Sequence, residues 1–310
     1  MAELLSCTFL VFCLLLQQKS FAQKESEIQL YAHEVPNALK STLPERAKFS
    51  NNGQLIALSN VINPRLLVFR PETPNGTAVI ICPGGGYRNL NIENVRFIAH
   101  RLMKMGITSF VLTYRLPADS LMIDKSTGAM QDVQQALRIV RQKAGDFELN
   151  FNRIGVWGSS AGGHLAAMAG THWNKSYDPK SDTTGLRPDF LILAWPVISF
   201  RAGMVHHGSM LNLLGKKPTE QQLSDYSADE QVDSQTPPTF LVHASDDPTV
   251  PVDNSIRFYQ ALKKHKVSAE LHIYEKGGHG FGISPDVKNS WMSQLEIWFA
   301  NRGLIPANSN

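Results

Sequence analysis

The chain has 310 residues, 43% of them hydrophobic, and a formal net charge of +3. This length can bury a large core in one or two domains, and the small net charge gives little support to nucleic-acid binding. The longest basic cluster, KKHK at 263–266, falls on the surface of an expected helix, where solvation of that helix explains it. Composition therefore favours a globular protein without a nucleic-acid partner.

The first residues differ from the rest of the chain. Residues 4–16 are almost wholly apolar, and Ser20-Phe21-Ala22 supplies a small-x-small cleavage site. The apolar run is shorter than the about 18 residues of a membrane span, so it predicts a signal peptide, 1–22, cleaved after Ala22. The mature protein would be secreted or periplasmic, without a stable membrane anchor. The start MAE lacks lysine and arginine, which leaves open a misassigned start codon or an uncleaved anchor.

The cysteines bear on the redox state of the mature chain. Cleavage after Ala22 would remove Cys7 and Cys13 and leave Cys82 as the single cysteine. A single cysteine can form no internal disulfide. Cys82 ends an apolar stretch, which is typical of a buried structural thiol rather than of a nucleophile.

Short apolar runs alternate with longer amphipathic stretches along most of the chain. The runs expected to be strands are 77–82, 108–114, 153–158, 190–195, 239–244 and 269–275. Continuous runs of Val, Ile and Leu are typical of strands buried on both faces, as in a parallel sheet. The stretches between them carry apolar residues at helical spacing. This alternation predicts an α/β fold with a mostly parallel, doubly wound sheet flanked by helices.

The sequence indicates a single domain of this kind over 23–310. No internal repeat or low-complexity linker interrupts the alternation of strands and helices. The longest stretch without strand character, 197–237, predicts either a lid or substrate loop, or a plain helical insertion.

The expected strand at 153–158 runs directly into Gly158-Ser159-Ser160-Ala161-Gly162, a G-x-S-x-G pattern. Where this pattern joins a buried strand to a helix, it forms a sharp turn that exposes the central serine as a nucleophile. The run of small residues after the pattern is long enough for a helix, so the pattern does lie between an expected strand and an expected helix. We therefore assign Ser160 as the nucleophile, with Ser159 as the competing serine.

A serine nucleophile needs a base, and in the chain order of α/β-hydrolases the base follows the acid near the end of the chain. Three histidines lie in that region. His265 fits a helix surface and His272 fits a strand interior, so both have structural explanations. His279 lies in KGGHGFG just past the last expected strand, where glycines allow a loop to bend to the edge of the sheet. His279 is therefore the expected base.

The acid is expected in the loop SDDPTVP at 245–251, which follows the strand at 239–244. Its carboxylate would hold the tautomer of the histidine and stabilise the imidazolium. Pro248 biases the residue before it toward an extended conformation, and the D-x-x-V spacing also favours Asp247 over Asp246.

The segment CPGGGY at 82–87 follows the first strong strand and corresponds to a glycine-rich oxyanion loop. The expected donors are the backbone N–H groups of Gly85, Gly86 and Ala161. A phosphate-binding loop is the alternative, but the G-x-x-x-x-G-K-[ST] pattern and its lysine are absent from the sequence. The chain also has no H-E-x-x-H or paired-cysteine motif, so neither a metal nor a cofactor is expected.

These motifs, with LTYRLP at 112–117 and DVQQALRIVR at 132–141, make the chain resemble a family of esterases over about 28–303. The family comprises α/β-hydrolase esterases of the acetylxylan esterase and feruloyl esterase-like group, related to dienelactone hydrolase. The resemblance implies a cofactor-free serine esterase that acts on acyl groups, often acetyl, of cell-wall polysaccharides or other sugars. It implies that Ser160 attacks the ester carbonyl, His279 accepts and returns the proton, and Asp247 orients the histidine.

Two other functions remain open. A serine peptidase of the prolyl-oligopeptidase type has similar motifs but generally a large additional N-terminal domain, where this chain has only 23–76. A non-catalytic binding protein on the same fold usually lacks a triad residue, and none is missing here. We expect Tyr87 and Trp195 to line the substrate site. The expected partner at this site is an ester substrate, an acylated carbohydrate.

Overall fold

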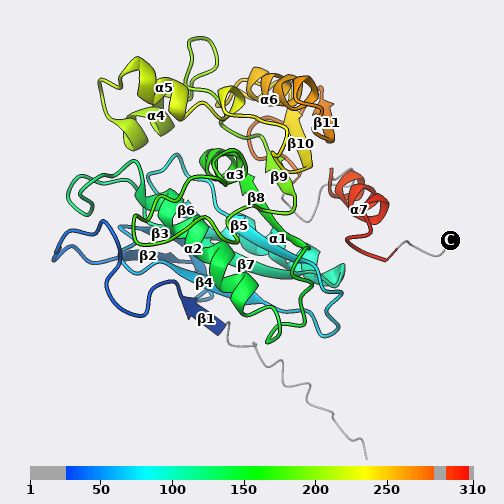
Figure 1. Cartoon of the computed structure of the whole chain (residues 1–310), viewed down its shortest axis with the longest axis horizontal. Helices are drawn as coiled ribbons and strands as arrows, with labels where there is room; N and C mark the ends of the chain where they lie inside the picture. Colours follow the sequence, from blue (N-terminus) through cyan, green and yellow to red (C-terminus); the bar gives the residue numbers. More distant parts are fainter. Residues whose placement is uncertain (1–25, 283–290, 307–310) are drawn as a thin grey trace, which may run out of the picture.

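A computed structural model describes residues 26–282 and 291–306. Its centre is an eight-stranded sheet, seen across the middle of Figure 1. From one edge to the other the strands are β1 (Ser26–Gln29), β4 (Arg65–Phe69), β7 (Thr108–Thr113), β5 (Ala78–Cys82), β8 (Ile154–Ser159), β9 (Leu191–Ala194), β10 (Thr239–Ala244) and β11 (Ala269–Tyr274). The predicted signal peptide, 1–22, lies outside the described residues.

Six of these strands, from β7 to β11 across the sheet, pair in parallel, and β4 and β1 add antiparallel pairs at one edge. The six parallel strands are those that the apolar runs of the sequence predict. Every residue of β5, β7, β8 and β10 is buried, which explains why these strands lack polar alternation. The prediction of a mostly parallel sheet is confirmed.

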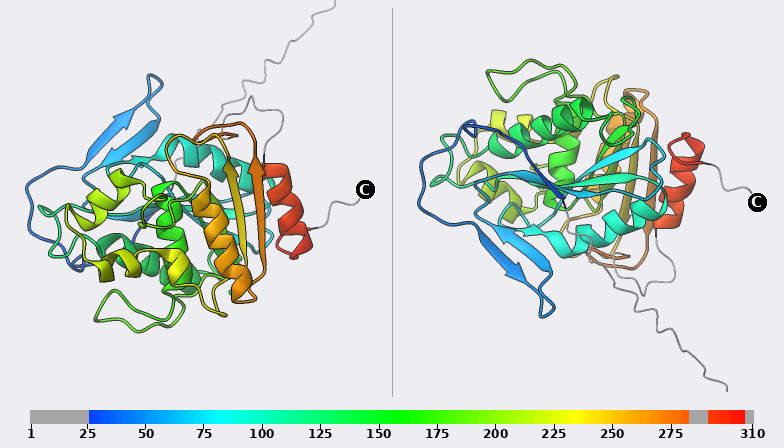
Figure 2. Two further views of the ribbon diagram at one scale, coloured as in Figure 1. Left: turned by 90° about the horizontal axis from the view of Figure 1, so that it is seen from above. Right: turned by 90° about the horizontal axis from the view of Figure 1, so that it is seen from below.

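Helices cover both faces of the sheet. In Figure 2 the helices α2 (Gly128–Gln142), α3 (Ala161–Thr171) and α6 (Asp253–Lys264) lie on one side, and α1 (Ile92–Lys104) and α7 (Met292–Asn301) lie on the other. This arrangement follows from right-handed crossovers, because the chain moves in one direction through α1 and in the opposite direction through α2, α3 and α6.

The N-terminal part of the chain contains strands that the sequence analysis does not predict. Besides β1 and β4, a second, three-stranded antiparallel sheet is formed by β2 (Arg46–Phe49), β3 (Leu55–Ser59) and β6 (Leu90–Asn91). Its hairpin projects from the body in Figure 2. All four residues of β2 are exposed, so they carry no apolar run from which a strand could be predicted.

The segment at 197–237 has no strand and is a mixture of short helices and irregular backbone. It contains α4 (His207–Leu214), α5 (Glu220–Asp225) and a 3₁₀ turn, η1 (Ala228–Glu230), at the top of Figure 1. The buried side chain of Asn254 on α6 accepts hydrogen bonds from the N–H groups of Ile198 and Ser199 and donates one to the Met204 carbonyl. The beginning of this insertion is therefore fixed to the helix that follows β10.

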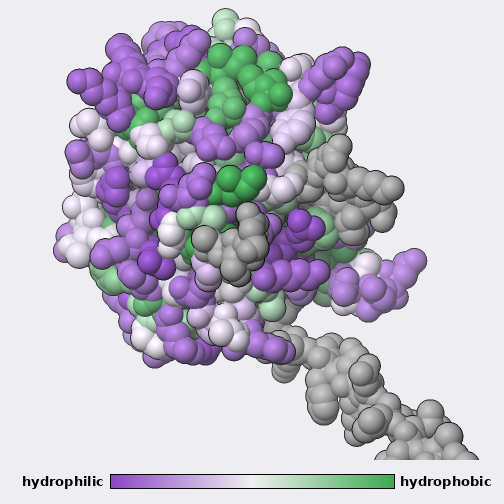
Figure 3. Space-filling view, turned by 90° about the vertical axis from the view of Figure 1, so that its right-hand side faces the viewer, coloured by the Kyte–Doolittle hydropathy of each residue, from purple (hydrophilic) through white to green (hydrophobic). Residues whose placement is uncertain are grey.

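Among the described helices, none combines the length and the apolar character that a membrane crossing requires. Cys82 is a free thiol buried in the core, and burial raises its pKa. The surface in Figure 3, the side on which α7 lies, is mostly hydrophilic with separate small hydrophobic areas.

Two buried histidines at α3 make stability depend on pH. Burial lowers the pKa of His164 and of His172 to about 4 from an ordinary 6.5. Between these pH values the unfolded chain binds protons that the folded chain excludes. Stability is therefore fully present above the unfolded value and is lost as the pH falls toward the folded value.

We expect the free energy of unfolding to fall through this window by at most about 1.4 kcal/mol per pH unit for each histidine. Urea titrations at steps through the window measure it. The double variant His164→Gln/His172→Gln removes both groups and should have a flatter dependence on pH. A wild-type stability that stays constant across the window would contradict this assignment.

Candidate active site

The turn between β8 and α3 carries Ser160 in a strained conformation. Its φ is 54° and its ψ is −126°, a region that residues with a side chain rarely adopt. A Cβ on Gly158 would lie 2.1 Å from the carbonyl oxygen of Gly162, and one on Gly162 would lie 2.1 Å from that of Cys82. The turn is this tight because both positions lack a side chain, and it leaves Ser160 at the carboxyl end of a central strand.

His279 lies in the loop after β11, and its two ring nitrogens have different partners. Nδ1 is 2.7 Å from Oδ2 of Asp247, and Nε2 is 2.9 Å from Oγ of Ser160. Because a carboxylate can only accept, Nδ1 carries the proton, and Nε2 of the neutral ring accepts from the serine hydroxyl. The structure thus brings together the serine, histidine and aspartate that the sequence predicts, while Ser159 makes no such contact.

The side chain of Asp247, after β10, is completely buried. Oδ1 accepts hydrogen bonds from the N–H groups of Thr249 and Val250, at 2.8 and 3.0 Å. Oδ2 lies 2.7 Å from His279 and 3.2 Å from Nε2 of His243. Burial opposes ionisation, but the hydrogen bonds from His243, His279 and the two amides outweigh it and hold the pKa of this carboxyl well below its usual range.

The neighbouring carboxylate, Asp246, has a different position. It is exposed, and its Oδ1 accepts from the N–H of Gly278 at 2.7 Å. Asp246 therefore holds the backbone of the histidine loop, whereas Asp247 contacts the imidazole of His279. The two neighbouring aspartates of this loop therefore have separate partners in the structure.

The glycine loop after β5 passes directly over the serine. A Cβ on Gly84 would lie 2.8 Å from the carbonyl oxygen of Ser159 and 3.1 Å from Cβ of Ser160. Gly85 and Gly86 have positive φ angles of 135° and 63°. Within the described ranges, the N–H groups of Gly85, Gly86 and Ala161 donate to no protein acceptor. These three amides are available to a negatively charged oxygen next to Ser160.

Both aromatic residues expected to line the substrate site face the interior. Tyr87 is 2% exposed, and its hydroxyl lies 2.8 Å from Nδ1 of His164. Nε2 of His164 lies 2.8 Å from the Tyr226 carbonyl and therefore carries the proton, so Tyr87 donates to Nδ1. The side chain of Tyr87 is therefore packed in the core beside His164, and little of it is exposed toward the site.

Trp195 is also 2% exposed, with a positive φ of 38°. Its ring packs edge-on against His279, with centroids 6.5 Å apart, and against Phe281 and Trp291. The side chain therefore supports the histidine loop rather than forming an open wall of the site. Sequence adjacency to a strand end could not reveal that these two residues turn inward.

One residue of the insertion, Asn212, contacts the glycine loop, and the sequence makes no prediction for it. A second, His206, lies beside the loop, since a Cβ added to Gly86 would be 3.8 Å from its Cε1. Asn212 on α4 donates from Nδ2 to the carbonyl of Gly86 at 2.8 Å. His206 caps α4, with Nδ1 accepting from the N–H of Ser209, so Nε2 of the neutral ring carries the proton. Burial and the nearby His279 lower the pKa of His206, which keeps its ring neutral beside the site.

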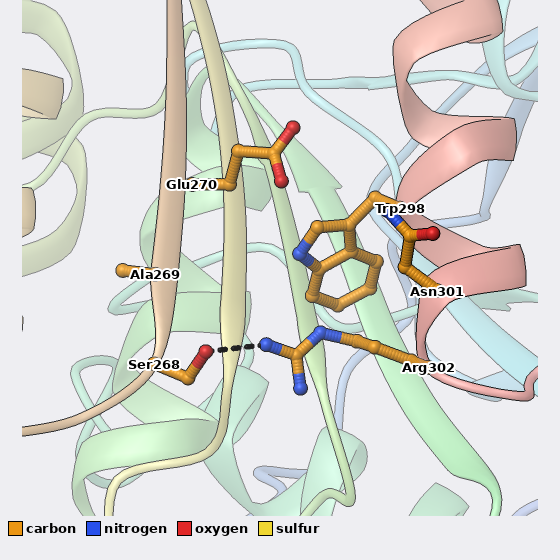
Figure 4. Close-up of a pocket in the computed structure, with 6 residues that line it drawn as sticks. All are labelled: Ser268, Ala269, Glu270, Trp298, Asn301 and Arg302. Carbon is orange, nitrogen blue, oxygen red and sulfur yellow. Dashed lines mark hydrogen bonds between the residues drawn. The ribbon is translucent and has the colours of Figure 1, made fainter.

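A separate pocket lies between β11 and α7 (Figure 4). Arg302 spans it to donate a hydrogen bond to Ser268 at 2.5 Å, and its guanidinium lies 4.5 Å from the ring centroid of Trp298. None of its lining residues belongs to the serine site. Elsewhere in the described chain, no three His, Cys, Asp or Glu residues form a group that could hold a metal ion.

The geometry and the sheet order define an α/β-hydrolase fold, and comparison with known proteins extends this assignment. The chain belongs to the BD-FAE family, whose model matches residues 67–262. The resemblance to acetylxylan and feruloyl esterase-like proteins is therefore confirmed.

Among individual relatives, the acetylxylan esterase of Xylanibacter ruminicola is 37% identical over 257 residues, covering 81% of this chain and 50% of that protein. Endo-1,4-beta-xylanase B of Butyrivibrio fibrisolvens is 29% identical over 210 residues, covering 67% of this chain and 33% of that protein. The chain thus spans half or less of the length of these curated relatives.

Solved structures give a more complete overlap. The acetyl ester-xyloside bifunctional hydrolase of Caldicellulosiruptor lactoaceticus aligns with a TM-score of 0.73 and 34% identity. This alignment covers 91% of the present chain and 97% of that one. The described fold is therefore close to that of a whole solved chain.

The contacts of the two neighbouring aspartates predict different consequences of their substitution. We expect Asp247→Asn to lower kcat by about 10³- to 10⁴-fold, because an amide would favour the wrong tautomer of His279 and would not stabilise its imidazolium. Asp246→Asn keeps an oxygen that can accept from Gly278 and should change kcat only a few-fold, by about the cost of one exposed hydrogen bond. Steady-state kinetics of both variants on an aryl acetate measure this, and the reverse order of effects would contradict the geometry.

Proposed function

We propose that the chain is a serine carboxylic ester hydrolase that removes acetyl or other small acyl groups from a carbohydrate such as acetylated xylan. The observation that carries this proposal is the continuous set of hydrogen bonds from Ser160 through His279 to Asp247. This set lies beside three amides with no protein acceptor in the described chain.

In the first half of the reaction, Oγ of Ser160 attacks the ester carbonyl while Nε2 of His279 accepts its proton. The charge on the carbonyl oxygen is received by the amides of Gly85, Gly86 and Ala161. Asp247 stabilises the imidazolium. The carbon–oxygen bond to the alcohol then breaks, and His279 returns the proton to the departing sugar hydroxyl.

In the second half, water attacks the acyl-serine, with His279 again accepting a proton. The carboxylic acid leaves as the bond to Oγ breaks, and the proton returns to Ser160. Every acid–base and electrostatic role in this cycle is assigned to a side chain or amide of the protein. The proposal therefore includes no metal and no cofactor.

The carbohydrate part of the proposal is supported by the named relatives, which include an acetylxylan esterase and an acetyl ester-xyloside hydrolase. The polar character of the insertion also supports it. Arg201 forms ion pairs with Glu220 and Glu230 on its surface, at 2.7 Å each. If this polar segment borders bound substrate, it suits a hydroxyl-rich substrate better than a long acyl chain. Secretion or a periplasmic location, after removal of 1–22, would bring the enzyme to such a polymer.

Substitution of the two adjacent serines tests the nucleophile. Ser160→Ala should abolish hydrolysis of an aryl acetate and leave the melting temperature within a few degrees, because it removes one hydroxyl at the surface of the core. Ser159→Ala is the matched control and should retain most activity. Hydrolysis that persists in Ser160→Ala would overturn the assignment of a serine hydrolase.

A substrate panel tests the specificity. We expect the protein starting at Gln23 to release acetate from acetylated xylan and to prefer acetyl among aryl esters of increasing acyl length. Rates that increase with acyl length would indicate a lipase. Feruloyl release without deacetylation would keep the mechanism but change the substrate, and cleavage of a proline-containing peptide would favour the peptidase alternative. Binding without turnover would favour a non-catalytic protein.

A further inference from the structure

A second histidine contacts the carboxylate of the proposed acid. His243 lies inside β10, and its side chain has no solvent exposure. Nε2 is 3.2 Å from Oδ2 of Asp247 and 3.0 Å from the carbonyl oxygen of Val250. Both neighbours can only accept, so Nε2 carries a proton whatever the charge of the ring.

The second nitrogen of the His243 ring also has a hydrogen-bond partner. Nδ1 of His243 lies 2.8 Å from Oγ of Ser255, a buried residue in the first turn of α6. The imidazole therefore cannot turn away from Asp247 without losing contacts on both of its nitrogens. It connects a helix on one face of the sheet to the carboxylate at the end of β10.

The hydrogen bonds to the carboxylate show what His243 contributes. A carboxylate has about four acceptor directions. Two amides fill those of Oδ1, and the two histidines fill those of Oδ2. Without His243, a buried anionic oxygen would lose one of its two donors, and only the two amides on Oδ1 would be left to orient the carboxylate toward His279.

We propose that His243 is a positioning residue that orients Asp247 and limits its basicity toward His279. This proposal rests on the proposed hydrolase function. A continuous series of hydrogen bonds then connects α6 to the proposed nucleophile through five side chains: Ser255, His243, Asp247, His279 and Ser160.

The predicted consequence concerns the pH profile. A donor on a carboxylate disperses its negative charge, so removal of that donor makes the carboxylate a stronger partner for the protonated form of His279. The acid limb of kcat/KM, which reports protonation of the base in the free enzyme, should then move to higher pH. Among the described residues, Ser160, Trp195 and the neutral His206 also lie beside His279, and the exposed carboxylate of Asp246 binds the amide of the preceding Gly278. None of these groups changes in this experiment.

The experiment compares His243→Leu and His243→Gln with the wild-type chain on an aryl acetate. His243→Leu should lower kcat about 10- to 100-fold with little change in KM, since misplacement of the acid affects chemistry rather than binding. Its acid limb should move to higher pH by about half a unit. His243→Gln can again place an N–H near Asp247 and should restore the wild-type profile and most of kcat.

The matched control is His272→Leu, the same substitution on the neighbouring strand β11, where the histidine pairs with Glu270 and has no contact with Asp247. Its profile should equal that of the wild type. A wild-type kcat and acid limb in His243→Leu would overturn the proposal. Equal losses in His243→Leu and His243→Gln, in proportion to a lower melting temperature and with an unchanged acid limb, would also overturn it.

If His243→Leu fails to fold, Ser255→Ala is measured in its place. This substitution removes only the partner of His243 Nδ1, and it should move the acid limb in the same direction by a smaller amount. An unchanged acid limb would overturn the proposal. Ser160→Ala separates the two levels of inference. Activity that persists in Ser160→Ala would overturn the proposed hydrolase function. Loss of activity in Ser160→Ala together with wild-type kinetics in His243→Leu would overturn only the role of His243.

Discussion

A carboxylate without solvent contact must find all of its hydrogen-bond donors inside the protein, and the site is built around this requirement at Asp247. Two donors come from the turn that carries the residue. The other two are imidazole nitrogens from different segments, His243 within β10 and His279 after β11. The parallel pairing of β10 with β11 brings these segments together. The position of His279, the proposed base, is thus linked to the burial of one negative charge.

The position of Ser160, the proposed nucleophile, depends on a different constraint, which is the space available to the backbone. The turn at Ser160 is strained, and it is held because glycines allow β8, α3 and the loop after β5 to approach to within backbone contact. The same close approach puts the amides of Gly85 and Gly86, which have no acceptor among the described residues, beside Ser160. Strain at the serine and the supply of donors are therefore two results of one packing arrangement.

Residues whose signals are local could be predicted from the sequence. Three signals are each visible within a short stretch of sequence: the glycines around Ser160, the glycines around His279 and the apolar runs of the six parallel strands. The choice of Asp247 over Asp246 followed from its spacing to Val250, whose amide does bind the Asp247 carboxylate in the structure. The family resemblance rested on the same motifs, which is why the fold class was also predictable.

Residues defined by their partners could not be predicted in this way. His243 lies in the apolar run of a strand, and its partner Ser255 is 12 residues further along the chain, on a helix. Tyr87 and Trp195 lie next to functional motifs, but their positive φ angles accompany side chains that point inward, and no sequence pattern reports this. β1 and β2 carry no apolar period, because most of their residues are exposed. β4 is different, since its buried run LLVF does resemble a strand, yet the sequence analysis assigns no strand there.

The hydrogen bond between Asn212 and the Gly86 carbonyl joins segments that are 126 residues apart in the sequence. The helical insertion is therefore not a separable module that could be exchanged without affecting the rest of the site. A chimera that received the insertion of a relative would also receive a different support for its glycine loop. Divergence in substrate choice within such a family would then be expected to couple to turnover, and the two segments would be inherited as a matched pair.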